Sequence, residues 1–243
     1  MTAIQCLHLT KEYPKVRAVD DLNLEVEEGE LFALLGVNGA GKSTTVKMLS
    51  TLAMPTSGDA VLLGKSLIHD REEVKQLIAV SPQETAVASN LTVFENLLFI
   101  AGAYGFSKKE AIQKSEQIAA QFGLDSVRTR RAGKLSGGWQ RRLSLAMALI
   151  GDPKILFLDE PTLGLDVLAR ADLWEMIRAL KGKTTMILTT HYMEEAEALS
   201  DRIGVMKEGK LLAVGTVEEL KKQTGCEKLE DVFIRIIREG GAK

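Results

Sequence analysis

The sequence predicts an α/β fold with a mostly parallel sheet, an N-terminal antiparallel β portion and an inserted helical lobe. Short apolar runs at residues 31–35, 155–158 and 185–189 are typical of strands buried on both faces of a sheet. Helical spacing between the last two runs favours parallel strands joined by a helix. Residues 91–150 contain no convincing strand, which indicates that a block of helices interrupts the core.

The N-terminal part begins with a half-buried strand. Leu22, Leu24 and Val26 alternate with polar residues, the period-two pattern of a strand with one face on the core. A turn at residues 28–30 leads into the buried strand at 31–35. Apolar residues then recur at helical spacing over residues 44–52, which predicts a helix directly after a glycine-rich loop.

The middle of the chain predicts three helices. The first covers residues 93–104. Ser107 is a suitable N-cap for a second helix, which runs to Phe122 and ends at Gly123. A third helix begins near Ser136.

The C-terminal part returns to the core. A helix at residues 167–180 separates the two buried strands, and residues 203–206 and 210–214 form a predicted hairpin. The tail at residues 217–238 has helical spacing and many charges.

These elements predict a single domain of 243 residues. Its core comprises residues 1–85 and 146–215, its helical lobe residues 86–145, and its helical tail residues 216–243.

Composition narrows the class of protein. The chain is 45% hydrophobic and 26% charged, and its net charge of -2 argues against a general nucleic-acid binder. Cys6 and Cys226 have no metal-ligand spacing and are predicted to be reduced, structural residues of a cytosolic protein. We find no signal-peptide pattern and no apolar run of the ~20 residues that a membrane helix needs. A role at a membrane would therefore require another chain as anchor.

The glycine-rich loop matches the Walker A pattern at every constrained position, from Gly36 to Ser43. Its glycines let backbone N–H groups approach phosphate oxygens, and the following helix directs its positive dipole end at the anion. Lys42 supplies a charge to the β and γ phosphates, and Ser43 supplies a hydroxyl ligand for Mg²⁺. We therefore predict a P-loop NTPase core whose loop binds nucleotide through Gly36, Asn38, Gly39, Ala40, Gly41, Lys42, Ser43 and Thr44.

Two carboxylates end the strand at residues 155–158. Asp159 lies where it can reach the metal, and Glu160 is placed to polarise an attacking water. The alternative is a strand followed by a solvated acidic turn, which the Walker A loop disfavours.

Three further residues are weaker candidates. His191 follows a strand and is either a rim residue or a contact of the γ-phosphate. Gln83 is either an ordinary loop residue or a Mg²⁺ ligand through which the presence of the γ-phosphate affects the helical lobe. Tyr13, expected just before the first strand pair, either stacks on adenine or packs against a loop.

A second anion-binding helix start lies at residues 135–139. Ser136, Gly137 and Gly138 leave the first backbone N–H groups of an amphipathic helix open to an anion. Since the chain already has one phosphate loop, this segment predicts a second nucleotide, and so two copies that hold ATP between them.

Together these segments resemble the nucleotide-binding subunit of an ABC transporter, from Ile4 to about Arg238. Six motifs occur in the order of that family. By this resemblance Tyr13 is the adenine-stacking residue and residues 36–43 are Walker A. Gln83 is in the Q-loop, and residues 135–139 are the signature segment. The other correspondences are Asp159 in Walker B, Glu160 as catalytic glutamate, Asp166 in the D-loop and His191 as switch histidine.

The resemblance implies an ATPase that uses ATP and Mg²⁺. Its catalytic residues are Glu160, His191 and Lys42, and its metal ligands are Ser43, Gln83 and Asp159. Two such subunits, identical or similar, pair head to tail, so that Ser136, Gly137 and Gly138 of one copy cap the γ-phosphate on the other. The pair serves a multispanning permease at the cytoplasmic face of the cell membrane, and no nucleic-acid partner is expected.

Two positions depart from the commonest family pattern. Trp139 replaces a glutamine, and either packs at the lobe surface or alters dimer contacts; Val167 replaces a proline. Residues 191–197 and 229–233 resemble the branch of drug, antibiotic, lipid and sodium exporters with separate permeases. Residues 85–97 either receive a cytoplasmic helix of the permease or are ordinary packing residues.

The alternative function is a soluble ABC-type ATPase in DNA repair or on ribosomes. Such relatives need a long coiled coil or two cassettes in one chain, and this sequence has one cassette and a short lobe. A nucleotide binder without turnover is disfavoured by the presence of Glu160 and His191.

Overall fold

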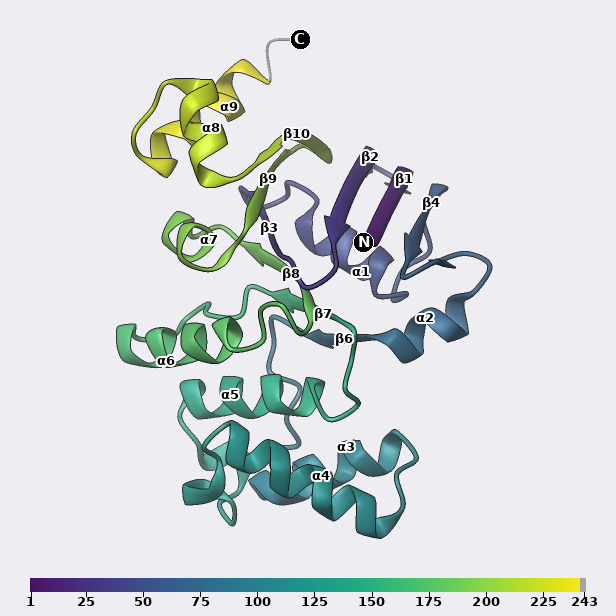
Figure 1. Cartoon of the computed structure of the whole chain (residues 1–243), viewed down its shortest axis with the longest axis vertical. Coiled ribbons are helices and arrows are strands. Elements are labelled where there is room, and N and C mark those ends of the chain that lie inside the picture. The colour runs from purple at the N-terminus through teal and green to yellow at the C-terminus, as the bar shows by residue number, and fades with distance from the viewer. Residues whose placement is uncertain (241–243) are drawn as a thin grey trace.

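The computed structural model describes residues 1–240, which form two sheets and the helices that cover them (Figure 1). The last three residues of the predicted tail, 241–243, lie outside the described part. The α/β class, the mostly parallel sheet and the N-terminal antiparallel portion are confirmed.

The smaller sheet is antiparallel, with strand order β2-β1-β4-β5. Its first strand was not expected: β1 (Thr2–Tyr13) pairs along β2 (Val16–Glu27). Tyr13 therefore ends a strand of the first pair instead of preceding that pair. The predicted alternation in β2 is confirmed, since Leu22, Leu24 and Val26 are all buried. The other edge is formed by β4 (Ser57–Leu62) and β5 (Lys65–Ser66), which the sequence did not predict.

The larger sheet has six strands in the order β10-β9-β3-β8-β7-β6. All neighbours are parallel except the hairpin of β9 and β10. The three buried runs become β3, β7 and β8. The bounds of the six strands are β3 (Leu31–Gly36), β6 (Ile78–Ser81), β7 (Ile155–Asp159), β8 (Thr185–Thr190), β9 (Arg202–Lys207) and β10 (Lys210–Gly215).

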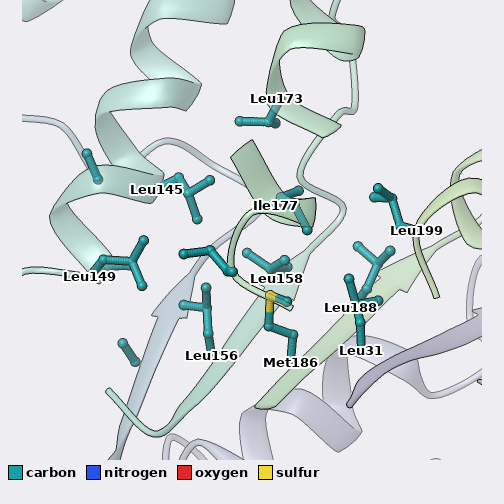
Figure 2. Packing of buried hydrophobic residues seen from close by; sticks show 14 of the residues in the cluster. Leu31, Leu145, Leu149, Leu156, Leu158, Leu173, Ile177, Met186, Leu188 and Leu199 are labelled. Carbon is teal, nitrogen blue, oxygen red and sulfur yellow. The ribbon is translucent and has the colours of Figure 1, made fainter. Parts of the chain in front are cut away.

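Successive residues of the parallel strands face opposite layers, because strand side chains alternate. Leu31, Leu156 and Leu188 belong to the core cluster on the side of α5 (Gly137–Ala148), α6 (Val167–Arg178) and α7 (Met193–Leu199). In Figure 2, Leu156 lies near Leu149, and Leu31 lies beside Leu188 on the side of Leu199. Phe32 and Phe157 pack on the other side, with α1 (Lys42–Leu49) and the antiparallel sheet. Both faces are thus buried, as the continuous apolar runs predict.

Helices fill the interval between β6 and β7. These are α3 (Val93–Ala103), α4 (Lys108–Gln121) and α5, which gather at one end of the molecule in Figure 1. Ser107 caps α4 as predicted, accepting a bond from the Glu110 N–H at 3.4 Å. Two short 3₁₀ turns lie between α4 and α5, Asp125–Val127 and Ala132–Lys134. The helix α5 continues to Ala148, three residues past the predicted edge of the lobe.

Some helices differ from expectation. The helix after the loop ends at Leu49 instead of residue 52, because Thr51 adopts a left-handed φ of 63°. The tail is two helices, α8 (Val217–Thr224) and α9 (Leu229–Glu239), since Gly225 has a φ of 67° and ends the first. The sequence did not predict the short helices α2 (Arg71–Leu77) and α7 (Met193–Leu199).

Within residues 1–240, none of the helices combines the length and apolar character needed to span a bilayer. Both cysteines are free thiols. Burial raises the pKa of the Cys6 thiol to about 12, so this thiol stays protonated near neutral pH.

Candidate nucleotide-binding site

The phosphate loop lies between the carboxyl end of β3 and the first turn of α1. Gly39 and Gly41 have φ values of 82° and 106°, which side-chain-bearing residues rarely adopt. A Cβ on Gly41 would lie 2.4 Å from the Ala18 carbonyl oxygen, so only glycine lets the loop approach β2 this closely. The loop and the first residues of α1 border a concave surface.

Lys42 is held inside this loop. Its Nζ donates hydrogen bonds to the carbonyls of Gly36, at 2.6 Å, and Val37, at 3.2 Å. Burial lowers the pKa of the Lys42 ammonium, while the charges of Glu160 and Asp159 oppose that shift. The loop thus holds a cation under its own backbone, where an added anion would find a complementary charge.

Asp159 joins the phosphate loop to two strands. The Ser43 hydroxyl donates to its Oδ1 at 3.1 Å, and the Thr189 hydroxyl of β8 donates to the same oxygen at 2.5 Å. A hydroxyl and a carboxylate are oxygen ligands of the kind Mg²⁺ takes, together with phosphate oxygens. Ser43 and Asp159 therefore fit a magnesium ion carried in with a nucleotide.

Glu160 follows in a strained conformation. Its φ is 47°, and its N–H donates to the Thr189 carbonyl at 3.0 Å, which holds it at the end of β7. Its Oε1 lies 3.2 Å from Nδ1 of His191, the residue that follows β8. Neighbouring parallel strands thus bring together two groups that are 31 residues apart in sequence.

These residues border one cavity of about 680 Å³. The cavity gathers most of the residues predicted from sequence, namely Tyr13, Asn38, Gly39, Ala40, Gly41, Lys42, Ser43, Thr44, Gln83, Glu160 and His191. Gly36 and Asp159 lie just behind this wall, bonded to Lys42 and Ser43. Tyr13 is 42% exposed, and its ring lies 5.2 Å from the Lys11 ammonium.

Sequence reasoning missed three residues of the wall: Val16, Ala18 and Leu163. Val16 and Ala18 belong to β2, and the pairing of β2 with β1 was not expected. Their small apolar side chains near Tyr13 were the available signal, but spacing alone could not place them beside the loop.

The other predicted site residues lie elsewhere. Ser136, Gly138 and Asp166 line a separate cavity of about 240 Å³, and Gly137 is on the same turn as Ser136 and Gly138. Ser136 is exposed and is the N-cap of α5, yet its hydroxyl makes no capping bond. The Asp166 carboxylate instead caps α6, accepting from the Ala169 N–H at 2.9 Å. A Cβ on Gly138 would lie 2.8 Å from Ala169 Cβ, so this glycine sets the close packing of α5 on α6.

Trp139 packs at the edge of the core cluster around α5. The Arg142 guanidinium lies 4.4 Å from the centre of its ring, and Arg142 also pairs with Asp172 at 2.8 Å. These contacts favour the packing interpretation of Trp139.

The family model for the ABC transporter matches residues 19–163, more than half of the chain. The chain belongs to the ABC transporter family. This match covers the phosphate loop, the signature segment and the Asp159–Glu160 pair.

Two similar proteins illustrate the range of the family. The chain is 41% identical to the probable multidrug ABC transporter ATP-binding protein YbhF of Escherichia coli, over 98% of this chain and 42% of that protein. It is also 41% identical to the daunorubicin/doxorubicin resistance ATP-binding protein DrrA of Streptomyces peucetius, over 93% of this chain and 69% of that protein. The chain thus spans less than half the length of the first relative.

Solved structures share the fold. An ATP-binding subunit of an ABC transporter superposes with a TM-score of 0.86, at 29% identity, over 97% of this chain and all of that one. The dimeric ATP-binding cassette MJ0796, in a post-hydrolysis state with ADP and Pi, gives a TM-score of 0.79 at 24% identity, over 88% of this chain and 98% of that one.

Proposed function

We propose that this chain binds and hydrolyses MgATP as the ATPase subunit of an ABC-type membrane exporter. The observation that carries the proposal is the meeting of one buried cation and two residue pairs at one cavity. The cation is Lys42 under the phosphate loop, and the pairs are Ser43 with Asp159 and Glu160 with His191. Membership of the ABC transporter family supports it, as do the relatives named for drug resistance.

Different residues contact the adenine, the phosphates and the metal. Tyr13 stacks on the adenine, and the loop residues Asn38 to Thr44 surround the phosphates with N–H groups. Lys42 neutralises phosphate charge. Ser43, Asp159 and Gln83 would hold Mg²⁺, and the bound ion would supply positive charge next to the phosphate oxygens.

Glu160 acts on the attacking water. Its carboxylate accepts a proton as the water oxygen attacks the γ-phosphorus and the bond to the ADP oxygen breaks. His191, 3.2 Å from the Glu160 carboxylate, orients that carboxylate and contacts the γ-phosphate. The left-handed backbone at Glu160 directs its side chain to the cavity that the phosphate loop borders.

A second subunit completes each site. Ser136, Gly137 and Gly138 are absent from the wall of the nucleotide cavity in their own copy, and the Ser136 hydroxyl makes no capping bond there. We propose that they bind the γ-phosphate held by a second copy or a similar subunit, in head-to-tail pairing. Asp166, beside them, belongs to the same interface.

Replacing Glu160 by Gln tests the ATPase assignment. Gln keeps the size and a hydrogen-bond acceptor but loses the base, so MgATP should still bind while turnover falls by about a hundredfold or more. Size-exclusion chromatography with MgATP should then show accumulated dimers. Normal hydrolysis by the Glu160→Gln protein would contradict the assignment of Glu160 as the catalytic base.

The permease is expected near the lobe. A cavity of about 180 Å³ lies beside the predicted segment 85–97, with Pro82, Ala86, Ile100 and Tyr104 in its wall. Phe99 is 62% exposed close to it in sequence. We propose that a cytoplasmic helix of a multispanning permease docks here and holds the chain at the inner membrane face.

Purification from native membranes tests this partner. A tagged chain should recover a multispanning protein, and Phe99→Asp should reduce that recovery without changing MgATP binding. Recovery of ribosomes or DNA instead would favour the soluble ABC-type alternative.

A further inference from the structure

Two adjacent arginines on α5 have different surroundings. Arg142 lies at the surface, where it pairs with Asp172 and covers Trp139. Arg141, on the next position of the helix, is only 3% exposed. A buried guanidinium keeps its charge and must find hydrogen-bond partners, since burying an unpaired charge is costly.

Arg141 bonds to three backbone carbonyls. Its Nη1 donates to the Pro82 carbonyl at 2.5 Å, and its Nη2 donates to the Gln83 carbonyl at 2.6 Å and the Glu160 carbonyl at 3.3 Å. Among residues 1–240 no carboxylate lies within salt-bridge distance of it. Burial lowers the pKa of the guanidinium, while the charges of Asp159 and Glu195 oppose the shift.

The carbonyls follow two neighbouring parallel strands that end at the nucleotide cavity. Pro82 and Gln83 follow β6, where Gln83 borders the cavity. Glu160 follows β7 and borders the same cavity. One planar guanidinium therefore fixes these two backbone segments relative to each other and to α5.

The helix α5 begins just one turn earlier, at Ser136 and Gly137. Because a helix is stiff over so short a distance, a shift of the Gln83 or Glu160 backbone moves the helix start with it. Arg142, whose partners are on α6 and α5, has no bond to either segment.

We propose that Arg141 is a positioning residue: its guanidinium transmits the state of one copy's nucleotide cavity to the helix start, Ser136 to Gly138, which that copy presents to its partner. This inference rests on the head-to-tail pairing proposed above. Arg141 touches neither nucleotide nor partner and acts through the backbone at Gln83 and Glu160.

The test compares binding with pairing in the Glu160→Gln background. Arg141→Met removes all donors at similar length, and Arg141→Lys keeps the charge but cannot bridge both segments. Arg128→Met is the matched control, because Arg128 is a lobe arginine that pairs with Glu116 far from the cavity. For each protein we would measure the MgATP dissociation constant of the monomer with a fluorescent analogue, and the MgATP concentration for half-maximal dimerisation by sedimentation.

We expect Arg141→Met to leave the dissociation constant within about twofold while raising the half-maximal concentration for dimerisation by about tenfold or more. Arg141→Lys should give an intermediate rise, and Arg128→Met none. If Arg141 only stabilises the fold, Arg141→Met should lower thermal stability. The ratio of the half-maximal MgATP concentration for dimerisation to the MgATP dissociation constant should then stay unchanged.

Equal dimerisation of Arg141→Met and its parent would overturn the inference. If Arg141→Met fails to fold by circular dichroism, Arg141→Lys decides, and pairing like the parent would overturn it. Failure of the parent itself to dimerise with MgATP would instead count against the proposed function, so the two failures are distinguishable.

Discussion

At the scale of one residue, Gly41 shows that the phosphate loop requires a residue without a side chain. Its φ of 106° and the 2.4 Å approach of a Cβ to the Ala18 carbonyl combine two penalties at one position. Left-handed backbone costs a non-glycine residue about 1–2 kcal/mol, and steric overlap adds to this. Gly102, inside α3, has open space around its Cβ position and an ordinary φ.

Replacing Gly41 by Ala should therefore lower the free energy of unfolding by about 1–3 kcal/mol. It should also abolish detectable MgATP binding, since the loop must move to relieve the overlap. Replacing Gly102 by Ala should raise stability by up to about 1 kcal/mol with unchanged MgATP binding. Denaturant unfolding measures the stability of each variant, and calorimetric titration measures its MgATP binding. Normal MgATP affinity in the Gly41→Ala protein would contradict this account of the loop.

The sequence predicted most of the residues at the nucleotide cavity, because each belongs to a motif with a chemical requirement. It could not predict Arg141. Nothing in the order Gln140-Arg141-Arg142 distinguishes the fully buried Arg141 from the partly buried Arg142. That difference depends on which way the helix faces, and so on contacts made with Pro82 and Glu160 from distant parts of the chain.

At the scale of elements, two helices begin at serine N-caps that differ in whether the hydroxyl makes a capping bond. Ser107 and Ser136 are both N-caps, of α4 and α5 respectively. The Ser107 hydroxyl accepts a bond from the Glu110 N–H, and the Ser107 N–H donates one to the Glu110 carboxylate at 2.9 Å. The Ser136 hydroxyl makes no capping bond, which leaves it for a ligand.

Alanine at these two positions should therefore have opposite effects. Ser107→Ala should lower the free energy of unfolding by about 1 kcal/mol and leave MgATP hydrolysis unchanged. Ser136→Ala should change stability by less than about 0.5 kcal/mol and slow hydrolysis by roughly tenfold or more. Urea unfolding and a phosphate-release assay give both values; a stability loss at Ser136 without slower hydrolysis would assign that hydroxyl to the helix.

The elements that were not predicted from the sequence have weak periodic patterns. β1, β4 and β5 lie in the antiparallel sheet, where charged residues such as Lys11 and Glu12 interrupt the apolar alternation. The short α2 and α7 have seven residues each, too few for helical periodicity to stand out. The buried strands β3, β7 and β8 were predictable because both of their faces are covered, which makes each a continuous apolar run.

At the scale of the whole molecule, the two helix starts that we propose as phosphate-binding sites border separate cavities. The start of α1 faces the cavity with Lys42 and Glu160, and the start of α5 faces the cavity with Asp166. We propose that these half-sites meet only between two copies.

Mixing two inactive variants tests this claim most directly. Lys42→Ala breaks the phosphate loop and Ser136→Arg blocks the signature segment, so dimers of either variant contain no intact site. In a mixed dimer, the loop of the Ser136→Arg chain meets the intact segment of the Lys42→Ala chain. If pairing is random and sites are independent, half of the dimers are mixed and each has one intact site of two, so hydrolysis recovers to about a quarter of the wild-type rate. Head-to-tail pairing predicts recovery above the sum of the separate variants, whereas a mixture no more active than that sum would contradict it.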